Sequence, residues 1–130
     1  FFVLNGDSFC DINFHDLYFA HKKRKASITI VIKESDQKKD YGNVIINEKG
    51  EIVRFMEKKV PANKKSYVSA GIYCFGKKAL ELIPDAYSSL ENDLFPNIPQ
   101  NSFYSFITKN NFLDIGTVER YNQIKLLGVK

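Results

Sequence analysis

The stretch Phe1-Phe2-Val3-Leu4-Asn5-Gly6-Asp7-Ser8 decides the fold class. Its first four residues form a short, entirely apolar run, which is typical of a strand buried on both faces of a parallel sheet. The next four residues are turn formers, so the strand is expected to end at residue 4. Such a strand needs neighbours on both edges and helices above and below it. Nothing precedes it here to supply them, so we expect the later part of a larger α/β domain.

The rest of the chain alternates between expected helices and strands. Asn13 and Thr117 stand where the N-caps of the first and last helices belong. The pattern predicts one α/β domain with a mixed, mostly parallel, Rossmann-like sheet, an inserted β-hairpin and an incomplete N-terminal side. Helices are expected over 14–25, 77–83, 90–98 and 117–127, strands over 27–32, 67–75 and 103–106, and the hairpin over 43–57.

Composition narrows the class of protein. Hydrophobic residues make up 44%, charged residues 26% and aromatic residues 14% of the 130 residues, a globular balance that argues against disorder. No apolar run approaches the roughly 18 residues that a membrane helix needs. Cys10 and Cys74 make no disulfide framework and fit a reducing cytosol. The net charge of +4 suits an anionic small molecule and is too small to imply nucleic acid.

Two aspartates stand where a sheet of this class binds ligands. Asp7 follows the first expected strand, and ligands of open α/β sheets bind at the carboxyl ends of strands. Asp114 lies between an apolar run and the last expected helix, where Gly116 permits a tight turn. One or two carboxylates, together with phosphates, usually hold Mg²⁺. Each aspartate could instead only cap its turn, and it is the pair that favours a metal site.

Six short motifs follow one another along the chain, each weak alone: Leu4-Asn5-Gly6-Asp7, Tyr41-Gly42-Asn43-Val44, Phe55-Met56-Glu57-Lys58, Ala70-Gly71-Ile72-Tyr73-Cys74-Phe75, Glu91-Asn92-Asp93-Leu94 and Asp114-Ile115-Gly116-Thr117. In this order they resemble the later two-thirds of a bacterial sugar-1-phosphate nucleotidyltransferase. Among subfamilies, the chain most resembles the guanylyltransferases that act on mannose- or heptose-type 1-phosphates. The resemblance covers nearly the whole chain, so residues 1–130 are expected to be the C-terminal part of a single nucleotidyltransferase domain.

The resemblance assigns roles to individual residues. It implies that Asp7 and Asp114 hold a catalytic Mg²⁺, and that Lys58 places a positive charge on the sugar phosphate. Glu57 would accept hydrogen bonds from sugar hydroxyls. The other substrate-binding residues that the resemblance implies are Asn5, Gly6, Gly42, Ala70, Gly71 and Glu91, with Gly42 and Gly71 letting the backbone approach the sugar. Without the family pattern, Glu57 and Lys58 would be a solvated pair, and Gly42 and Gly71 a turn and a bulge.

The implied reaction joins an NTP, with GTP expected, to a sugar 1-phosphate. The sugar phosphate attacks the α-phosphorus and pyrophosphate leaves, in a cytoplasmic enzyme that serves surface polysaccharide or lipopolysaccharide synthesis. No nucleic acid or membrane partner is implied. The family's glycine-rich NTP loop would lie upstream of Phe1, so we expect this chain to hold the metal and sugar-phosphate half of the site and to be inactive alone.

The chain departs from the family pattern at three places. Lys59, Ser69 and Val118 stand where the family often has Pro, Asn and Pro, and the change at Ser69 alters a hydrogen bond to the sugar. One alternative is a non-catalytic, nucleotidyltransferase-like module that binds a phosphosugar or has a regulatory role, which an upstream sequence without the glycine-rich loop would favour. A further possibility is self-association through exposed sheet edges.

Overall fold

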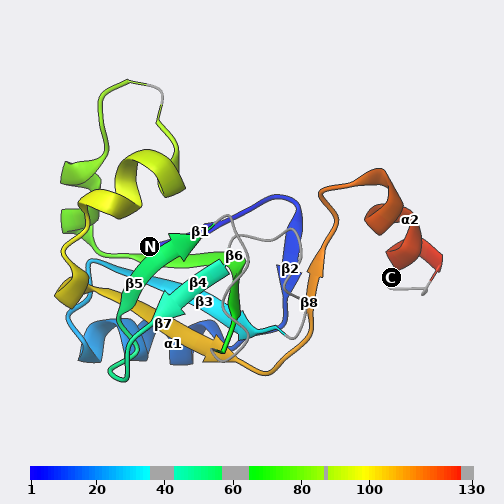
Figure 1. Ribbon diagram of the computed structural model, residues 1–130, viewed down its shortest axis with the longest axis horizontal. Coiled ribbons are helices and arrows are strands. Elements are labelled where there is room, and N and C mark those ends of the chain that lie inside the picture. The colour runs from blue at the N-terminus through cyan, green and yellow to red at the C-terminus, as the bar shows by residue number, and fades with distance from the viewer. Residues whose placement is uncertain (36–42, 57–64, 87, 127–130) are drawn as a thin grey trace.

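The computed structural model describes residues 1–35, 43–56, 65–86 and 88–126 (Figure 1). They form a sheet, a two-stranded ladder beside it, two α-helices and several one-turn helices. The elements are β1 (Phe2–Leu4), β2 (Ser8–Cys10), α1 (Phe14–Lys23), β3 (Ile28–Glu34), β4 (Asn43–Ile46), β5 (Ile52–Met56), β6 (Tyr67–Phe75), η1 (Lys77–Leu82), η2 (Leu90–Leu94), η3 (Phe95–Asn97), η4 (Gln100–Ser102), β7 (Phe103–Thr108), β8 (Phe112–Asp114) and α2 (Val118–Leu126).

The main sheet is built around β6. Its strands run in the order β5-β4-β6-β3-β7, and β1 pairs with β6 on the same side as β4. The mixed sheet of the sequence prediction is confirmed, but the parallel majority is wrong. Among the described strand pairs, only β3 and β7 run parallel. A parallel pair needs a long crossover, and the chain between β3 and β7 supplies one, whereas the hairpin connection of β4 and β5 returns antiparallel.

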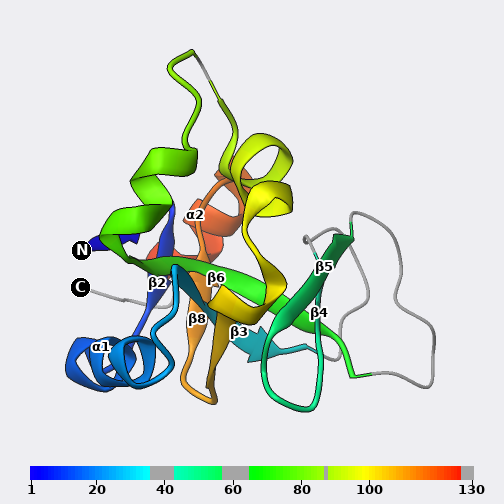
Figure 2. The same cartoon turned by 90° about the vertical axis from the view of Figure 1, so that its left-hand side faces the viewer.

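Two apolar layers cover the two faces of the sheet. Alternation along β3 sends Ile28, Ile30 and Ile32 to one face and Val31 to the other. The first face packs under the one-turn helices, with Phe95 at its centre. The second face packs under α1 through Leu17, which is completely buried. Figure 2 shows α1 on one side of the sheet and the green-to-yellow helical turns on the other.

The first strand differs from its expectation. β1 pairs antiparallel with β6, and no other described strand pairs with it. Phe1, Phe2 and Leu4 expose 56%, 37% and 52% of their surface, so burial on both faces is wrong for this structure. Val3 packs against the core cluster that includes Phe75, and the ring centroid of Phe1 lies 5.6 Å from that of Phe75.

The first α-helix begins where its capping residue predicts, but two other segments expected to be helices form only short turns. The Asn13 side chain accepts hydrogen bonds from the amides of His15 and Asp16, which confirms the start of α1. The segments expected as helices over 77–83 and 90–98 form 3-10 and π turns, in keeping with Pro84 and Pro96, which cannot continue an α-helix. None of the helices in the described ranges is long and apolar enough to cross a membrane.

The antiparallel ladder of β2 and β8 was not expected from the sequence. Each strand has three residues, and the ladder lies beside β6 (Figure 1). β2 begins immediately after Asp7, and β8 ends at Asp114. The ladder therefore joins the two segments that carry the candidate metal ligands.

Candidate active site

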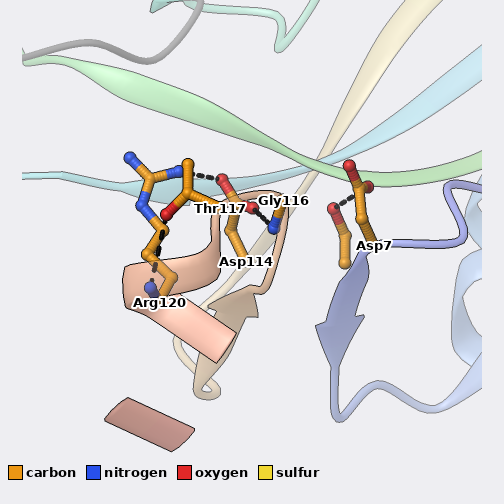
Figure 3. Close-up of polar contacts among 6 residues, drawn as sticks. Asp7, Asp114, Gly116, Thr117 and Arg120 are labelled. Atoms are coloured by element: carbon orange, nitrogen blue, oxygen red, sulfur yellow. Dashed lines mark hydrogen bonds and ion pairs between the residues drawn. The ribbon is translucent and has the colours of Figure 1, made fainter. Parts of the chain in front are cut away.

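The β2–β8 ladder brings Asp7 and Asp114 together from opposite ends of the chain. Ser8 pairs with Asp114, and the amide of Ile115 donates a hydrogen bond of 2.8 Å to the carbonyl oxygen of Asp7. The two aspartates thus occupy neighbouring positions at the same end of the ladder. In Figure 3 their side chains lie on either side of Gly116.

Gly116 is the point on which both carboxylates converge. A Cβ atom at this residue would lie 3.0 Å from Asp114 Oδ1 and 3.1 Å from Asp7 Oδ2. These separations are shorter than ordinary carbon–oxygen contacts, so a side chain at residue 116 would displace a carboxylate. The glycine that the sequence suggested for a turn also keeps open the space between the two acids.

Asp114 is firmly held. Its Oδ1 accepts a hydrogen bond of 2.7 Å from the Gly116 amide, and its Oδ2 forms an ion pair of 2.6 Å with Nη1 of Arg120 (Figure 3). Arg120 lies in the first turn of α2, and its amide donates to Thr117 Oγ1 at 3.3 Å, which confirms Thr117 as the cap of this helix. Sequence analysis did not identify Arg120, because its role depends on how α2 leaves β8.

Asp7 is exposed and is held more loosely. Its carboxylate accepts a hydrogen bond of 3.3 Å from the hydroxyl of Ser8. Ser8 is also half-buried against Gly71, whose added Cβ would lie 2.9 Å from Ser8 Oγ.

A pocket of about 160 Å³ opens between the carboxylates and β6. Five of the residues that the sequence proposed line it together, namely Asn5, Asp7, Gly71, Glu91 and Asp114. Its other lining residues are Ser8, Ser69, Tyr73 and Phe112. We call this set the acidic pocket, because its three charged residues are all acids.

The family follows from a comparison with known proteins. A model of the nucleotidyl transferase family matches residues 1–127, almost the whole chain. The chain belongs to the nucleotidyl transferase family. The resemblance inferred from the six motifs is therefore confirmed at the level of the family.

Individual relatives of this nucleotidyl transferase chain are longer than it is. The chain is 37% identical over 121 residues to a mannose-1-phosphate guanyltransferase of Yarrowia lipolytica, covering 89% of this chain and 32% of that protein. It is 34% identical over 119 residues to the mannose-1-phosphate guanylyltransferase catalytic subunit beta of Dictyostelium discoideum, covering 89% and 33%. The chain thus spans about a third of the length of these curated relatives.

Solved structures agree with the fold. HddC from Yersinia pseudotuberculosis superposes with a TM-score of 0.77 at 28% identity, over 95% of this chain and 52% of that one. The same protein complexed with GMP-PN gives a TM-score of 0.74. The mixed sheet of this nucleotidyl transferase chain is therefore the sheet of its structural neighbours.

Gly71 acts as both a bulge and a point of close approach. Its φ of +68° lies in the left-handed region, and the β3–β6 register jumps there from Ile30–Tyr73 to Ile32–Ser69. The Gly71 carbonyl accepts a hydrogen bond of 2.8 Å from the Asn5 amide, and an added Cβ would lie 2.9 Å from Asn5 Nδ2. The bulge is therefore confirmed, whereas the approach of the Gly71 backbone to a sugar stays a prediction.

Tyr73 and Ser69 form a polar floor, of which the sequence had pointed only to Ser69 as a residue that affects sugar binding. The Tyr73 ring is buried, and its hydroxyl lies 3.5 Å from Ser69 Oγ. Burial raises the pKa of Tyr73, so the hydroxyl keeps its proton and remains a hydrogen-bond donor. The motif that contains Tyr73 was recognised, but it did not show that the hydroxyl reaches the pocket.

The other proposed residues fall into three groups. The Ala70 side chain is completely buried against α1, so only its backbone is available to a ligand. Gly6 lies in the exposed turn, with open space where a side chain would stand. Gly42, Glu57 and Lys58 lie outside the described residues.

A larger and more apolar pocket borders the acidic pocket. It measures about 370 Å³ and is lined mainly by β5 and η3, including Phe55 and Phe95, whose rings stack at 5.0 Å. Glu91 lines both pockets. Neither Asp7 nor Asp114 lines the larger pocket, so pocket size does not identify the site of the two carboxylates.

Proposed function

We propose that this chain forms the metal- and sugar-phosphate-binding half of a sugar-1-phosphate guanylyltransferase. The whole domain would transfer a guanylyl group from GTP to a sugar 1-phosphate and release pyrophosphate. The observation that carries the proposal is the convergence of Asp7 and Asp114 on Gly116. The guanylyltransferase names of the curated relatives and the GMP-PN complex of the structural neighbour support the choice of nucleotide.

The donor set fits a divalent cation such as Mg²⁺. Two carboxylate oxygens approach one point, and one of the two acids is exposed to solvent. In the part of the chain that the structure describes, no group of three or more His, Cys, Asp and Glu side chains is close enough together to hold a metal ion by itself. Asp7 and Asp114 would therefore hold the ion together with phosphate and water oxygens, as is usual for Mg²⁺. The bound ion would supply positive charge that offsets the negative charge developing on the phosphates in the transition state.

The protein's own part in this reaction is to position two polyanions. A sugar phosphate is already an anionic nucleophile, so its attack on the α-phosphorus needs no general base. Tyr73, Asn5 and Glu91 line the acidic pocket, and their hydroxyl, side-chain amide and carboxylate groups would bind sugar hydroxyls. A pocket of polar groups discriminates strongly among sugars, because a mismatched sugar leaves one of those groups without a partner. Glu57 and Lys58 remain predicted contributors.

The acidic pocket would repel a phosphate unless cations are also present. Asp7, Glu91 and Asp114 all line it, and Arg120 neutralises only one side of Asp114. We therefore expect mannose 1-phosphate to bind this chain with Mg²⁺ and to bind at least about tenfold more weakly when EDTA removes the metal. Calorimetric titration measures both. Equal affinity in the two conditions would contradict the proposed metal site.

The chain alone is expected to be inactive. Its seven glycines are isolated from one another, so residues 1–130 contain no glycine-rich loop to enclose the NTP phosphates. A mixture with Mg²⁺, GTP and mannose 1-phosphate should release pyrophosphate only at background rate. Normal turnover by the chain would refute this part of the proposal. The same proposal places the whole enzyme in the cytoplasm and gives its nucleotide sugar to the synthesis of surface polysaccharide or lipopolysaccharide.

One observation favours a second candidate, a non-catalytic phosphosugar-binding module. The ion pair of Arg120 with Asp114 gives that carboxylate a positive partner within the chain itself. Such a module would bind mannose 1-phosphate equally well with and without metal, so the titration that tests the first proposal also distinguishes the two.

We also propose that the exposed edge of β1 lets the chain self-associate. Phe1, Phe2 and Leu4 present apolar surface beside a strand edge that no other described strand covers. Light scattering should show a mass above that of the monomer that rises with protein concentration. A strictly monomeric chain would count against the proposal.

A further inference from the structure

A pocket of about 330 Å³ lies at the opposite end of β1 from Asp7. Backbone hydrogen bonds join Phe1 to Phe75, and the pocket is lined from the residues just after Phe75 and from the turn between α1 and β3. The described residues that line it include five basic ones and no acidic one. We call these five the basic pocket: His21, Lys22, Lys25, Lys77 and Lys78.

The lysines of the basic pocket have no acidic partner among the described residues. The two ion pairs among the described residues join Lys65 to Glu34 and Arg120 to Asp114, and neither pair lies in the basic pocket. The Lys22 ammonium lies 6.0 Å from the Tyr18 ring centroid, a contact that is weak at an exposed site. Positive charge at the C-terminal end of α1 is explained by the helix dipole. That explanation does not extend to Lys77 and Lys78, which come from a separate segment.

The turn after α1 places Lys25 where glycine is the usual residue. The Ala26 amide donates to the His21 carbonyl and the Lys25 amide donates to the Lys22 carbonyl, so the helix ends in the Schellman arrangement. Lys25 occupies its left-handed position with φ +50°, at a conformational cost that glycine would avoid. Lys25 therefore adds an ammonium group to the lining of the basic pocket, at a cost in local backbone stability.

The floor of the pocket is preformed. His21 is buried, and its Nδ1 lies 2.9 Å from Thr29 Oγ1, which fixes the ring. A Cβ at Gly76 would lie 3.5 Å from His21 Nε2 and 3.1 Å from the Ala26 carbonyl oxygen. Because Gly76 has no side chain, the space beside His21 and the Ala26 carbonyl stays open.

We propose that the basic pocket binds a diphosphate group. Four ammonium groups that have no acidic partner within the described ranges match a ligand of several negative charges better than a single phosphate. The volume suits a small molecule. The same chemistry is available from free pyrophosphate and from the diphosphate of a nucleotide sugar, both of which the proposed reaction would produce. The site itself rests only on the geometry described above and shares no residue with the acidic pocket.

Titration of the 130-residue chain with pyrophosphate in the presence of EDTA tests the site. EDTA prevents the two aspartates from recruiting the anion through a metal. The double variant K77Q/K78Q should weaken binding at least about tenfold, since two charge-assisted contacts are lost. The control K49Q/K109Q makes the same change of net charge at two exposed lysines elsewhere and should change affinity less than about twofold. Asp7→Asn should leave pyrophosphate binding unchanged, which separates this test from that of the proposed function.

Lys25→Gly separates binding from folding. Glycine removes the left-handed strain, so the variant should melt at the wild-type temperature or above it while binding pyrophosphate more weakly. If GDP-mannose competes with pyrophosphate for the basic pocket, the pocket also accepts the diphosphate of a nucleotide sugar. If GDP-mannose does not compete, free pyrophosphate is the ligand of the pocket. Absence of pyrophosphate binding, equal losses in K77Q/K78Q and K49Q/K109Q, or inorganic phosphate binding as tightly as pyrophosphate would overturn the proposal.

Discussion

The two aspartates of the acidic pocket are held in very different ways. Asp114 is partly buried, at 17% side-chain exposure, and both of its oxygens are occupied by the Gly116 amide and Arg120. Asp7 is exposed and is contacted by the hydroxyl of Ser8. The difference implies that the Asp114 carboxylate keeps its position when a ligand binds, whereas the Asp7 carboxylate can move to meet the ligand. Changes to Gly116, Arg120 and Ser8 separate these contributions.

Gly116→Ala should have the largest effect, because it acts on both aspartates. The new methyl group would lie 3.0 and 3.1 Å from their oxygens and would push at least one of them away. We expect Mn²⁺ affinity, measured by electron paramagnetic resonance, to fall by about a hundredfold, the upper range for loss of a positioning contact at a metal site. Gly6→Ala is the matched control, because its methyl group enters open space. Equal Mn²⁺ affinities in the two variants would show that the carboxylates do not share an ion.

Arg120→Gln should have an intermediate effect that acts on Asp114 alone. The glutamine amide can still donate a hydrogen bond to Oδ2, but the positive charge beside the metal site is gone. Mn²⁺ should therefore bind more tightly, by a few-fold to about tenfold. Because Arg120 is only partly buried, the free energy of unfolding should fall by less than about 1 kcal/mol. Weaker Mn²⁺ binding would show instead that the arginine serves mainly to orient the carboxylate.

Ser8→Ala should have the smallest effect, because it removes only the long 3.3 Å hydrogen bond to exposed Asp7. We expect a change of about twofold in Mn²⁺ affinity, since an exposed hydrogen bond of this length contributes little net free energy. The same titration measures it. A loss as large as that of Gly116→Ala would mean that Asp7 is as firmly held as Asp114, and the contrast between them would be wrong.

The fold was predictable where local sequence signals agree with tertiary packing. The bounds of β6 were expected as 67–75 and are found there, because its nearly continuous run of apolar residues is buried on both faces of the sheet. The caps Asn13 and Thr117 were readable for the same local reason. The strands β2 and β8 were not predicted, since each has only three residues and includes a polar one, Ser8 or Asp114, so neither shows the unbroken apolar run of residues 1–4.

The sequence predicted which residue types form the candidate site but not how those residues contact one another. Position after a strand and the family motifs pointed to Asp7 and Asp114. The role of Gly116 between them, the ion pair of Arg120 and the reach of the Tyr73 hydroxyl depend on how distant segments meet. The left-handed backbone of Gly71 is likewise a tertiary result, because glycine permits that conformation without requiring it.

The most direct test compares Mn²⁺ binding by the wild-type chain, Asp7→Asn and Asp114→Asn. Asparagine has nearly the same shape, so the thermal unfolding temperature should confirm that the fold is kept. The account predicts that each single substitution weakens Mn²⁺ binding at least about tenfold, and that the double variant shows no specific site. Wild-type affinity in either single variant would contradict the claim that the two carboxylates bind one ion.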